Sequence, residues 1–507
     1  MNRTRTPAGN PAGGEYAAHA RPEADATLKA DMSSYRTSAP GLMRLTPATQ
    51  RVLAAIRAAG GTPLIVGGSV RDALLAVNRE AVVYPKDIDI EAYGVQDKNR
   101  LLAELARVGR VDERGVSFGV IAVAVRGEDF DVSLPRRDSK NGDGHTGFDV
   151  ETDPDLDEVT AFGRRDFTIN ALGFDPQAQE LIDPYGGQAD LAAGVLRHTS
   201  MAFADDPLRV LRGVSFAARF GFTMAGETAE LCASIADKYG DLSTMRIWGE
   251  WQKIACRGTN ISAALTVLAD TGWIRHYPEL DSLRGLTQSP DWHPEGDVYT
   301  HAGLSADFAA RTGDANGWDG LARQVAVLGA LTHDLGKATH TRRDAETGKI
   351  TAHGHAEAGV ALTESFLERI GAPRRLIGLI TPIVREHMCH TSFTGAPSAT
   401  AVRRLIRRLN PKGTGPSILD WAHVVDADHN GRGSGNKPSP TGAWLDAAKN
   451  IGTTPLRGLL RGEHLIAAGM VPGREFAPIL AAAVEAQDDG LFDDEAGAIA
   501  WFQNYRR

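Results

Sequence analysis

The chain has 507 residues, of which 42% are hydrophobic and 23% charged, and its formal net charge is −9. This length predicts three or more domains, and the composition is that of an ordinary soluble protein. No apolar run approaches the length of a membrane span and the N-terminus lacks a signal-peptide core, so we expect no membrane association.

The cysteines and the charge narrow the expected location and partners. Cys232, Cys256 and Cys389 are scattered and odd in number, so neither a disulfide framework nor a cysteine-based zinc site is expected, and the predicted location is the cytoplasm. The negative net charge argues weakly against a nucleic-acid partner, because phosphate contacts require clustered Lys and Arg. The densest basic run, AVRRLIRRLNPK (401–412), could be a local nucleic-acid patch or a solvated helix face.

The first elements along the chain are a tail, a helix and a strand. Residues 1–42 are rich in Gly, Ala, Pro and Thr without periodicity, which predicts a disordered tail. Thr46 and Pro47 are typical of a helix start, and this helix should run to Gly60. The short apolar run of residues 64–66 then predicts a buried strand.

An anion cradle is predicted directly after that strand. Gly67 and Gly68 have no Cβ, so backbone there can approach a bulky anion closely. The helix predicted for SVRDALLAV (69–77) would point its free N–H groups toward the same spot, with Arg71 on its first turn.

Paired carboxylates follow the cradle. In KDIDIEAYG (86–94), Asp87 and Asp89 lie two apart on a predicted strand, so both leave the same face, roughly 6–7 Å apart. After a helix near 97–107, FGVIAVAV (118–125) and DFDVSLP (129–135) predict a β-hairpin that brings Asp131 beside them as a third ligand. Such a set can hold the two Mg²⁺ ions that a phosphoryl or nucleotidyl transfer needs.

A second group of charged residues opens the helical part of the chain. Residues 138–158 are expected to form a mobile loop, and GRRDFTINALGFD (163–175) follows it. From about residue 190 the pattern is helical with no convincing strand, so the fold class is an α/β head on an all-α body. In ADDPLRVLRGVSFAARFGF (204–222), Asp206 and Arg209 are three apart and share a helix face. That pair could hydrogen-bond the edge of a base and select C and A, or it could be an ordinary helix ion pair.

Taken together these motifs resemble the DNA polymerase β nucleotidyltransferase superfamily. GGSVRDALL, KDIDIE, FDVSLPRRD, RRDFTINAL and DDPLRVLRGVSFAARFGF follow the order and spacing of bacterial-type CCA-adding enzymes, the tRNA nucleotidyltransferases, and their poly(A) polymerase relatives, over about residues 60–255. The resemblance implies a polymerase β-like mixed sheet, tRNA, ATP and CTP as partners, and Mg²⁺ at Asp87 and Asp89, with Asp131 as the third catalytic carboxylate. The residues expected to bind the nucleotide are Gly67, Gly68, Arg71, Arg165, Asp166, Asp206, Arg209 and Arg212.

Three positions depart from the family pattern. Asp205 stands in place of a Glu, and Ser215 in place of an Arg that touches the triphosphate in many relatives. Met245 replaces the Glu that usually precedes Arg-Ile, which we interpret as a change in packing.

Histidines gather in the second half of the chain, where ten of the fifteen fall between His293 and His429. The motifs that contain His301, the pair His333 and Asp334, and Asp428 resemble the HD phosphohydrolase superfamily, and His355 and His387 would complete a second metal position. Imidazole and carboxylate ligands suit a divalent transition metal such as Ni, Co or Mn. The resemblance implies hydrolysis of 2′,3′-cyclic phosphates and 2′-nucleotides, which suits tRNA end repair.

The sequence therefore predicts five segments and one main function with rivals. The segments are a tail (1–42), a nucleotidyltransferase head (43–190), a helical neck for base selection and RNA binding (191–285), an HD domain (286–440) and a C-terminal helical segment (441–507). The main hypothesis is CCA addition to tRNA. The rivals are a poly(A) polymerase or A-adding enzyme, an HD hydrolase whose head only binds RNA, and a non-catalytic tRNA-binding protein; no oligomeric state is predicted.

Overall fold

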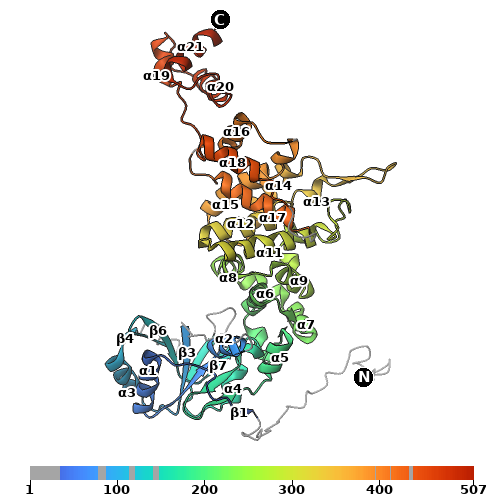
Figure 1. Cartoon of the computed structure of the whole chain (residues 1–507). Helices are drawn as coiled ribbons and strands as arrows, with labels where there is room; N and C mark the ends of the chain where they lie inside the picture. Colours follow the sequence, from blue (N-terminus) through green and yellow to red (C-terminus); the bar gives the residue numbers. More distant parts are fainter. Residues whose placement is uncertain are drawn as a thin grey trace, which may run out of the picture.

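The computed structural model describes residues 35–77, 87–112, 120–140, 148–393, 395–411, 413–432 and 438–506. The chain runs along one elongated molecule, with a sheet-containing head at one end, stacked helices in the middle and a small helical unit at the C-terminal end (Figure 1). The predicted fold class, an α/β head followed by an all-α body, is confirmed.

The head is built on an eight-stranded mixed sheet with the order β1-β10-β9-β2-β3-β6-β5-β4. Neighbouring strands are antiparallel except β3 and β6, which are parallel and place Asp89 directly opposite Asp131. The strands are β1 (Arg36–Ser38), β2 (Thr62–Val66), β3 (Asp87–Tyr93), β4 (Arg110–Asp112), β5 (Val120–Val125), β6 (Glu128–Ser133), β9 (Gly173–Asp175) and β10 (Glu180–Ile182).

Alternation along β3 and β6 fixes which side of the sheet carries the carboxylates. Ile88, Ile90, Phe130 and Val132 are buried in the head core. Because successive side chains of a strand point to opposite faces, the aspartates between them are turned away from that core. Helices α1 (Pro47–Ala58) and α3 (Lys98–Val108) contribute to this core, and α2 (Gly68–Val77) follows β2 directly.

The predicted helices of the head are confirmed. Helix α1 begins where the Thr46-Pro47 signal predicts, since the Thr46 side chain accepts a hydrogen bond from the Thr49 N–H at 3.0 Å. Asp97 caps α3 in the same way.

Three sequence predictions are wrong in part. Residues 35–42 are not a disordered tail, because β1 pairs with β10 and Arg36 forms ion pairs with Glu158 and Glu180; residues 1–34 lie outside the described part. The predicted loop at 138–158 contains strands β7 (Arg136–Lys140) and β8 (Phe148–Thr152), which pair with each other. The body also holds short two-residue strands, β11 (Val195–Leu196) with β12 (Thr223–Met224) and β13 (Arg342–Arg343) with β14 (Ile350–Thr351).

The body is a continuous stack of helices around one hydrophobic core that extends from Phe167 to Ala448. No helix in the described part is long and apolar enough to cross a bilayer. Helix α4 (Glu158–Gly163) belongs to the head, where it packs against β2 in a small separate core. The helices of the body are α5 (Gly187–Ala193), α6 (Leu208–Phe220), α7 (Gly226–Ser234), α8 (Thr244–Arg257), α9 (Ile261–Asp270), α10 (Pro278–Asp281), α11 (Val298–Asn316), α12 (Gly320–Thr332), α13 (Lys337–His340), α14 (His355–Arg369), α15 (Arg374–Glu386), α16 (Ala399–Leu409), α17 (Ile418–Asn430) and α18 (Gly442–Ile451).

The basic run at 401–412 lies largely on α16, and several of its arginines bind carboxylates of the protein itself. Arg407 donates to both oxygens of Asp488, and Arg404 donates to Asp489 at 2.8 Å. These acceptors lie at the end of α20 (Phe476–Asp488), which packs with α19 (Gly462–Ala467) and α21 (Glu495–Tyr505) around a separate small core. The basic helix therefore attaches the C-terminal unit to the body.

Candidate functional site

The first candidate site begins at the junction of β2 and α2. Gly67 has φ +77°, and a Cβ there would lie 2.8 Å from Arg165 Nη1 and 3.5 Å from Asp89 Oδ2. Both the backbone conformation and the close approach of these side chains therefore require glycine. Since α2 begins at the next residue, its free N–H groups open onto the same space, as the sequence predicts.

The carboxylates lie beside this junction. Asp89 on β3 and Asp131 on β6 share a small cavity of about 170 Å³, which Glu91, Arg164 and Arg165 also line. Adjacent strands lie about 4.8 Å apart, so these two carboxylates are close enough to act on one ligand. The backbone of Asp87 lies in register with Asp129 on the neighbouring strand, whereas its side chain is outside the described part.

A larger cavity of about 450 Å³ brings Asp89 and all eight predicted nucleotide-binding residues together. It extends from the Gly-Gly turn of the head to the first turns of α6 and α8. Sequence reasoning missed several of its lining residues. The complete lining is Gly67, Gly68, Arg71, Asp89, Arg164, Arg165, Asp166, Asn170, Asp206, Leu208, Arg209, Arg212, Phe216 and Arg246.

Buried partners fix the arginines of this cavity. Arg71 is 4% exposed and donates to Asn170 Oδ1 at 2.5 Å, while its guanidinium lies over the Phe216 ring. Arg164 and Arg165 both donate to Glu91 Oε1, at 2.8 and 3.1 Å. Burial alone would raise the pKa of Glu91, but the two guanidinium groups outweigh it and the pKa is lowered. Glu91 is therefore a charged anchor that holds two cations at the mouth of the site.

The predicted pair of Asp206 and Arg209 differs from expectation in its contacts. Both residues line the cavity, but the ion-pair partner of Asp206 is Arg246 on α8, whose Nη2 lies 2.9 Å from Oδ2. Arg209 instead donates to the backbone carbonyls of Ala202 and Arg164. Arg246 follows Met245 in STMRIWGE (243–250), and from the sequence alone the replacement at Met245 is interpreted as a change in packing. That interpretation is wrong, because Met245 is 79% exposed.

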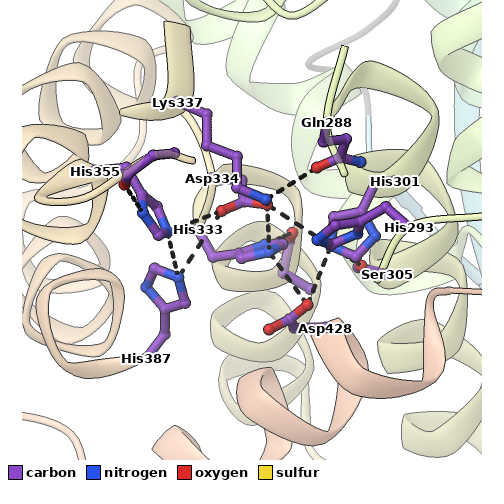
Figure 2. Close-up of polar contacts among 12 residues, drawn as sticks. Gln288, His293, His301, Ser305, His333, Asp334, Lys337, His355, His387 and Asp428 are labelled. Atoms are coloured by element: carbon purple, nitrogen blue, oxygen red, sulfur yellow. Dashed lines mark hydrogen bonds and ion pairs between the residues drawn. The ribbon is translucent and has the colours of Figure 1, made fainter. Parts of the chain in front are cut away.

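The second candidate site lies in the helical body. Six predicted residues from five places in the chain meet there (Figure 2). His301 comes from α11, His355 begins α14 and Asp428 lies on α17. The adjacent His333 and Asp334 directly follow α12, and His387 directly follows α15.

Asp334 lies between two groups of ligand atoms. Its Oδ2 is 3.2 Å from His333 Nε2 and 3.7 Å from His301 Nε2, and its Oδ1 is 3.2 Å from His355 Nε2 and 3.9 Å from His387 Nε2. Asp428 Oδ1 completes the first group at 3.1 Å from His301 Nε2. His301, His333 and Asp428 thus form one potential set of three ligands, and Asp334, His355 and His387 form another.

Hydrogen bonds donated by Nδ1 orient three of the imidazoles. His333, His355 and His387 each have Nδ1 2.7 Å from a backbone carbonyl oxygen, so Nδ1 carries the proton in the neutral ring and Nε2 turns a lone pair toward the cluster. His301 Nδ1 lies 2.7 Å from a side chain instead, the carboxylate of Glu295. His333 Nε2 is buried yet makes no hydrogen bond among the described residues. A divalent cation would satisfy this nitrogen, so the residues fit a metal.

The charges of the cluster also suit a metal. Burial lowers the pKa of His387 to about 3, with the neighbouring His333 and His355 adding to the effect, so this imidazole is a neutral donor. Burial opposes the charge of His301, but the carboxylates of Asp428 and Glu295 outweigh it and raise its pKa to about 9. Asp334 is held in its ionised form by the surrounding imidazoles and Lys337, which keep its pKa well below the usual range despite burial. A buried site with two carboxylates and four imidazoles can take up positive charge.

Comparisons with known proteins match the regions of the chain that contain most residues of each site. A family model of the poly(A) polymerase head domain matches residues 64–197, and a model of the HD domain matches residues 298–415. A multifunctional CCA protein of Xanthomonas campestris is 34% identical over 425 residues, which cover 80% of this chain and 96% of the relative. A protein of the same name from Vibrio parahaemolyticus is 33% identical and covers 73% of this chain and 85% of the relative.

Solved structures show the same fold at lower sequence identity. A CCA-adding enzyme of Bacillus stearothermophilus in complex with CTP has a TM-score of 0.59 and 19% identity, covering 91% of this chain and 98% of that one. A CCA-adding enzyme of Thermotoga maritima in complex with tRNA has a TM-score of 0.55 and 19% identity, covering 93% of this chain and 100% of that one.

Proposed function

This chain belongs to the multifunctional CCA protein family, and we propose that its head adds CCA to the 3′ end of tRNA from CTP and ATP without a nucleic-acid template. The observation that carries this proposal is the single cavity of about 450 Å³ that joins the Gly-Gly turn, Asp89 and the pair of Asp206 and Arg209. One bound nucleotide can therefore contact a phosphate cradle, a metal-binding carboxylate and a base-reading pair at once.

Different residues of the head are assigned to metal binding and to triphosphate binding. Asp87 and Asp89 would hold Mg²⁺, a hard ion that oxygen ligands satisfy, with Asp131 as the third carboxylate. These carboxylates would hold the metal where it could supply Lewis-acid chemistry, which would assist deprotonation of the primer 3′-hydroxyl and departure of pyrophosphate. Arg71, Arg165 and the free N–H groups of α2 neutralise the triphosphate and fix it in line with the hydroxyl. These residues need no reorganisation because Asn170, Phe216 and Glu91 already hold the arginines.

Base choice is assigned to Asp206, with Arg209 beside it and Arg246 as its positioning residue. The ion pair with Arg246 holds the Asp206 carboxylate in place at the cavity wall. A carboxylate accepts hydrogen bonds and a guanidinium donates them, so together they can test both kinds of group on a base edge.

Asp206→Ala is expected to lower the selectivity for CTP and ATP over UTP and GTP. Loss of one hydrogen-bonding group costs about 1–3 kcal/mol, which corresponds to roughly 5- to 150-fold in discrimination. The measurement is kcat/KM for each nucleotide with a tRNA that lacks its 3′ end. Asp241→Ala, an exposed carboxylate outside the cavity, serves as the control. Unchanged selectivity with a uniformly lower rate would place the pair in a structural role.

The body supports a second activity, because Asp334 lies between two sets of metal ligands. We assign to the HD domain hydrolysis of 2′,3′-cyclic phosphates and 2′-nucleotides, with a transition metal held by His301, His333, Asp334 and Asp428 and a second position completed by His355 and His387. Imidazole ligands favour such a metal over Mg²⁺. The chemistry that such a metal would supply here is a hydroxide nucleophile for hydrolysis of the phosphate ester.

The decisive experiment for the head separates CCA addition from its rivals. A tRNA lacking its 3′ end is incubated with each labelled nucleotide, alone and in combination. CCA addition requires two C residues followed by one A. Incorporation of A alone, or of a long A tract, would assign the chain to the A-adding or poly(A) polymerase class. No incorporation alongside active phosphohydrolysis would favour the HD hydrolase with an RNA-binding head.

A further inference from the structure

The six side chains that meet in the body, which we call the HD cluster, are His301, His333, Asp334, His355, His387 and Asp428. A cavity of about 770 Å³ opens onto this cluster, and Asp334, His355 and Asp428 form part of its wall. This volume is within the range of sites that enclose a whole small-molecule ligand. A phosphate group in contact with the cluster would fill only a small part of that space. The rest of the cavity is therefore available for the remainder of the phosphate ester, and its lining indicates what that remainder is.

Trp292 is the unusual residue of this lining. It is 68% exposed, whereas Trp251, Trp273 and Trp421 are fully buried. Within the described part of the chain, the Trp292 ring has no stacking, cation or hydrogen-bonding partner. Leaving so large an apolar ring in water forgoes about 1.5–3 kcal/mol of burial, which a bound ligand would recover.

The backbone holds Trp292 close to the metal ligands. The N–H groups of Trp292 and His293 both donate to the Ser289 carbonyl, at 3.1 and 2.9 Å. The ring centroid of His293, the next residue, lies 4.7 Å from that of His301, and Figure 2 shows these two imidazoles side by side. Trp292 is thus one residue from a group that contacts a metal ligand.

Cationic side chains on the same wall suit a phosphorylated ligand. Lys337 Nζ lies 2.6 Å from Asp334, and Arg432 Nη2 lies 3.2 Å from Asp428. Lys349 is exposed, and its ammonium group has no partner among the described residues. The cavity therefore combines potential metal ligands, cations for phosphate and one free aromatic face.

We propose that Trp292 is a stacking platform for the nucleobase of a ribonucleotide whose 2′-phosphate or 2′,3′-cyclic phosphate lies at the HD cluster. This inference rests on the proposed phosphohydrolase activity and adds its specificity-determining residue. Every base has a π-face, so stacking tolerates any base. The HD domain would then require a nucleobase without choosing among the four, which fits a site that must act on whatever nucleotide ends a damaged RNA.

The test compares esters with and without a base. Wild type, Trp292→Ala, Trp292→Phe and Leu419→Ala, each loaded with Ni²⁺, are assayed on adenosine 2′,3′-cyclic phosphate and on methyl riboside 2′,3′-cyclic phosphate. Leu419 is half exposed on α17 and lies outside the cavity wall, so it controls for loss of surface apolar area. Adenosine 2′-monophosphate is titrated calorimetrically into the same proteins to measure binding without turnover.

Trp292→Ala is expected to raise KM for the adenosine ester about 5- to 150-fold with kcat nearly unchanged, and to weaken adenosine 2′-monophosphate binding by a similar factor. The methyl riboside ester should be unaffected, and Trp292→Phe should keep most of the binding. Equal effects on both esters, or no effect on either ester or on binding, would overturn the inference. If wild type hydrolyses neither ester, the proposed hydrolysis fails, and the titration alone then decides whether Trp292 binds the base.

Discussion

Asp89→Asn is expected to abolish nucleotide addition, lowering its rate by about 10³-fold or more. The asparagine keeps the shape of the side chain but removes the charge of a proposed metal ligand at the cavity that also contains the Gly-Gly turn and Asp206. Removal of one electrostatic group aimed at a transition state costs about 10²–10³ in kcat, and the loss of a metal ligand should match or exceed that. The measurement is single-turnover addition of labelled CTP to a tRNA that lacks its 3′ end, with saturating Mg²⁺.

The fold should survive this change, because Asp89 points away from the buried Ile88 and Ile90 of the head core. Glu104→Ala removes a head carboxylate on α3 outside both cavities and should leave addition at the wild-type rate. Hydrolysis of 2′,3′-cyclic phosphate by the Asp89→Asn protein should also be unchanged. Nucleotide addition at a near-normal rate by this variant would refute the assignment of Asp89 as a ligand.

Local sequence patterns were enough to predict most strands and helices of the head. The alternation in KDIDIE and DFDVS fixes which side chains are buried, so Asp89 and Asp131 emerge on one face wherever their strands pair. The Gly-Gly turn and the helix after it are also local features, and the cradle followed from them. The wrong predictions concern pairings between distant segments. Strand β1 forms because β10, more than 140 residues away, supplies its hydrogen-bonding partners. Residues 36–38 alone contain no pattern that predicts this pairing.

The sites show the same division between local and distant information. The resemblance of the motifs around His301, His333 and Asp428 to the HD superfamily was enough to predict which side chains meet in the body. Their supporting residues were not predictable in this way. Arg246 lies 40 residues from Asp206, and the roles of Glu295 and Trp292 depend on a turn that packs against α11. A ligand is recognisable by its residue type, whereas a residue that orients a ligand can be of many types and is defined by its neighbours in space.

Asp334→Asn tests whether the two activities are separable. Asp334 is the one residue whose two oxygens face both ligand groups of the HD cluster, so its loss should disturb both metal positions (Figure 2). Loss of an outer-shell partner already weakens metal binding 10- to 100-fold, so removal of this ligand should exceed about 100-fold. Hydrolysis of 2′,3′-cyclic phosphate with Ni²⁺, Co²⁺ or Mn²⁺ should fall to background, and mass spectrometry should find the metal lost from purified protein.

CCA addition by the Asp334→Asn protein should continue at the wild-type rate, since the head cavity contains no residue of the HD domain. Asp426→Asn is the matched control. Asp426 lies on α17 two residues before Asp428, and it accepts hydrogen bonds from the Ser439 and Thr441 hydroxyls instead of contacting the cluster. Asp334 also pairs with the buried Lys337, so circular dichroism and thermal unfolding accompany the assays to separate a lost ligand from a lost fold. If Asp334→Asn, natively folded, lost CCA addition as well, the two sites would be coupled through the continuous helical core that joins them.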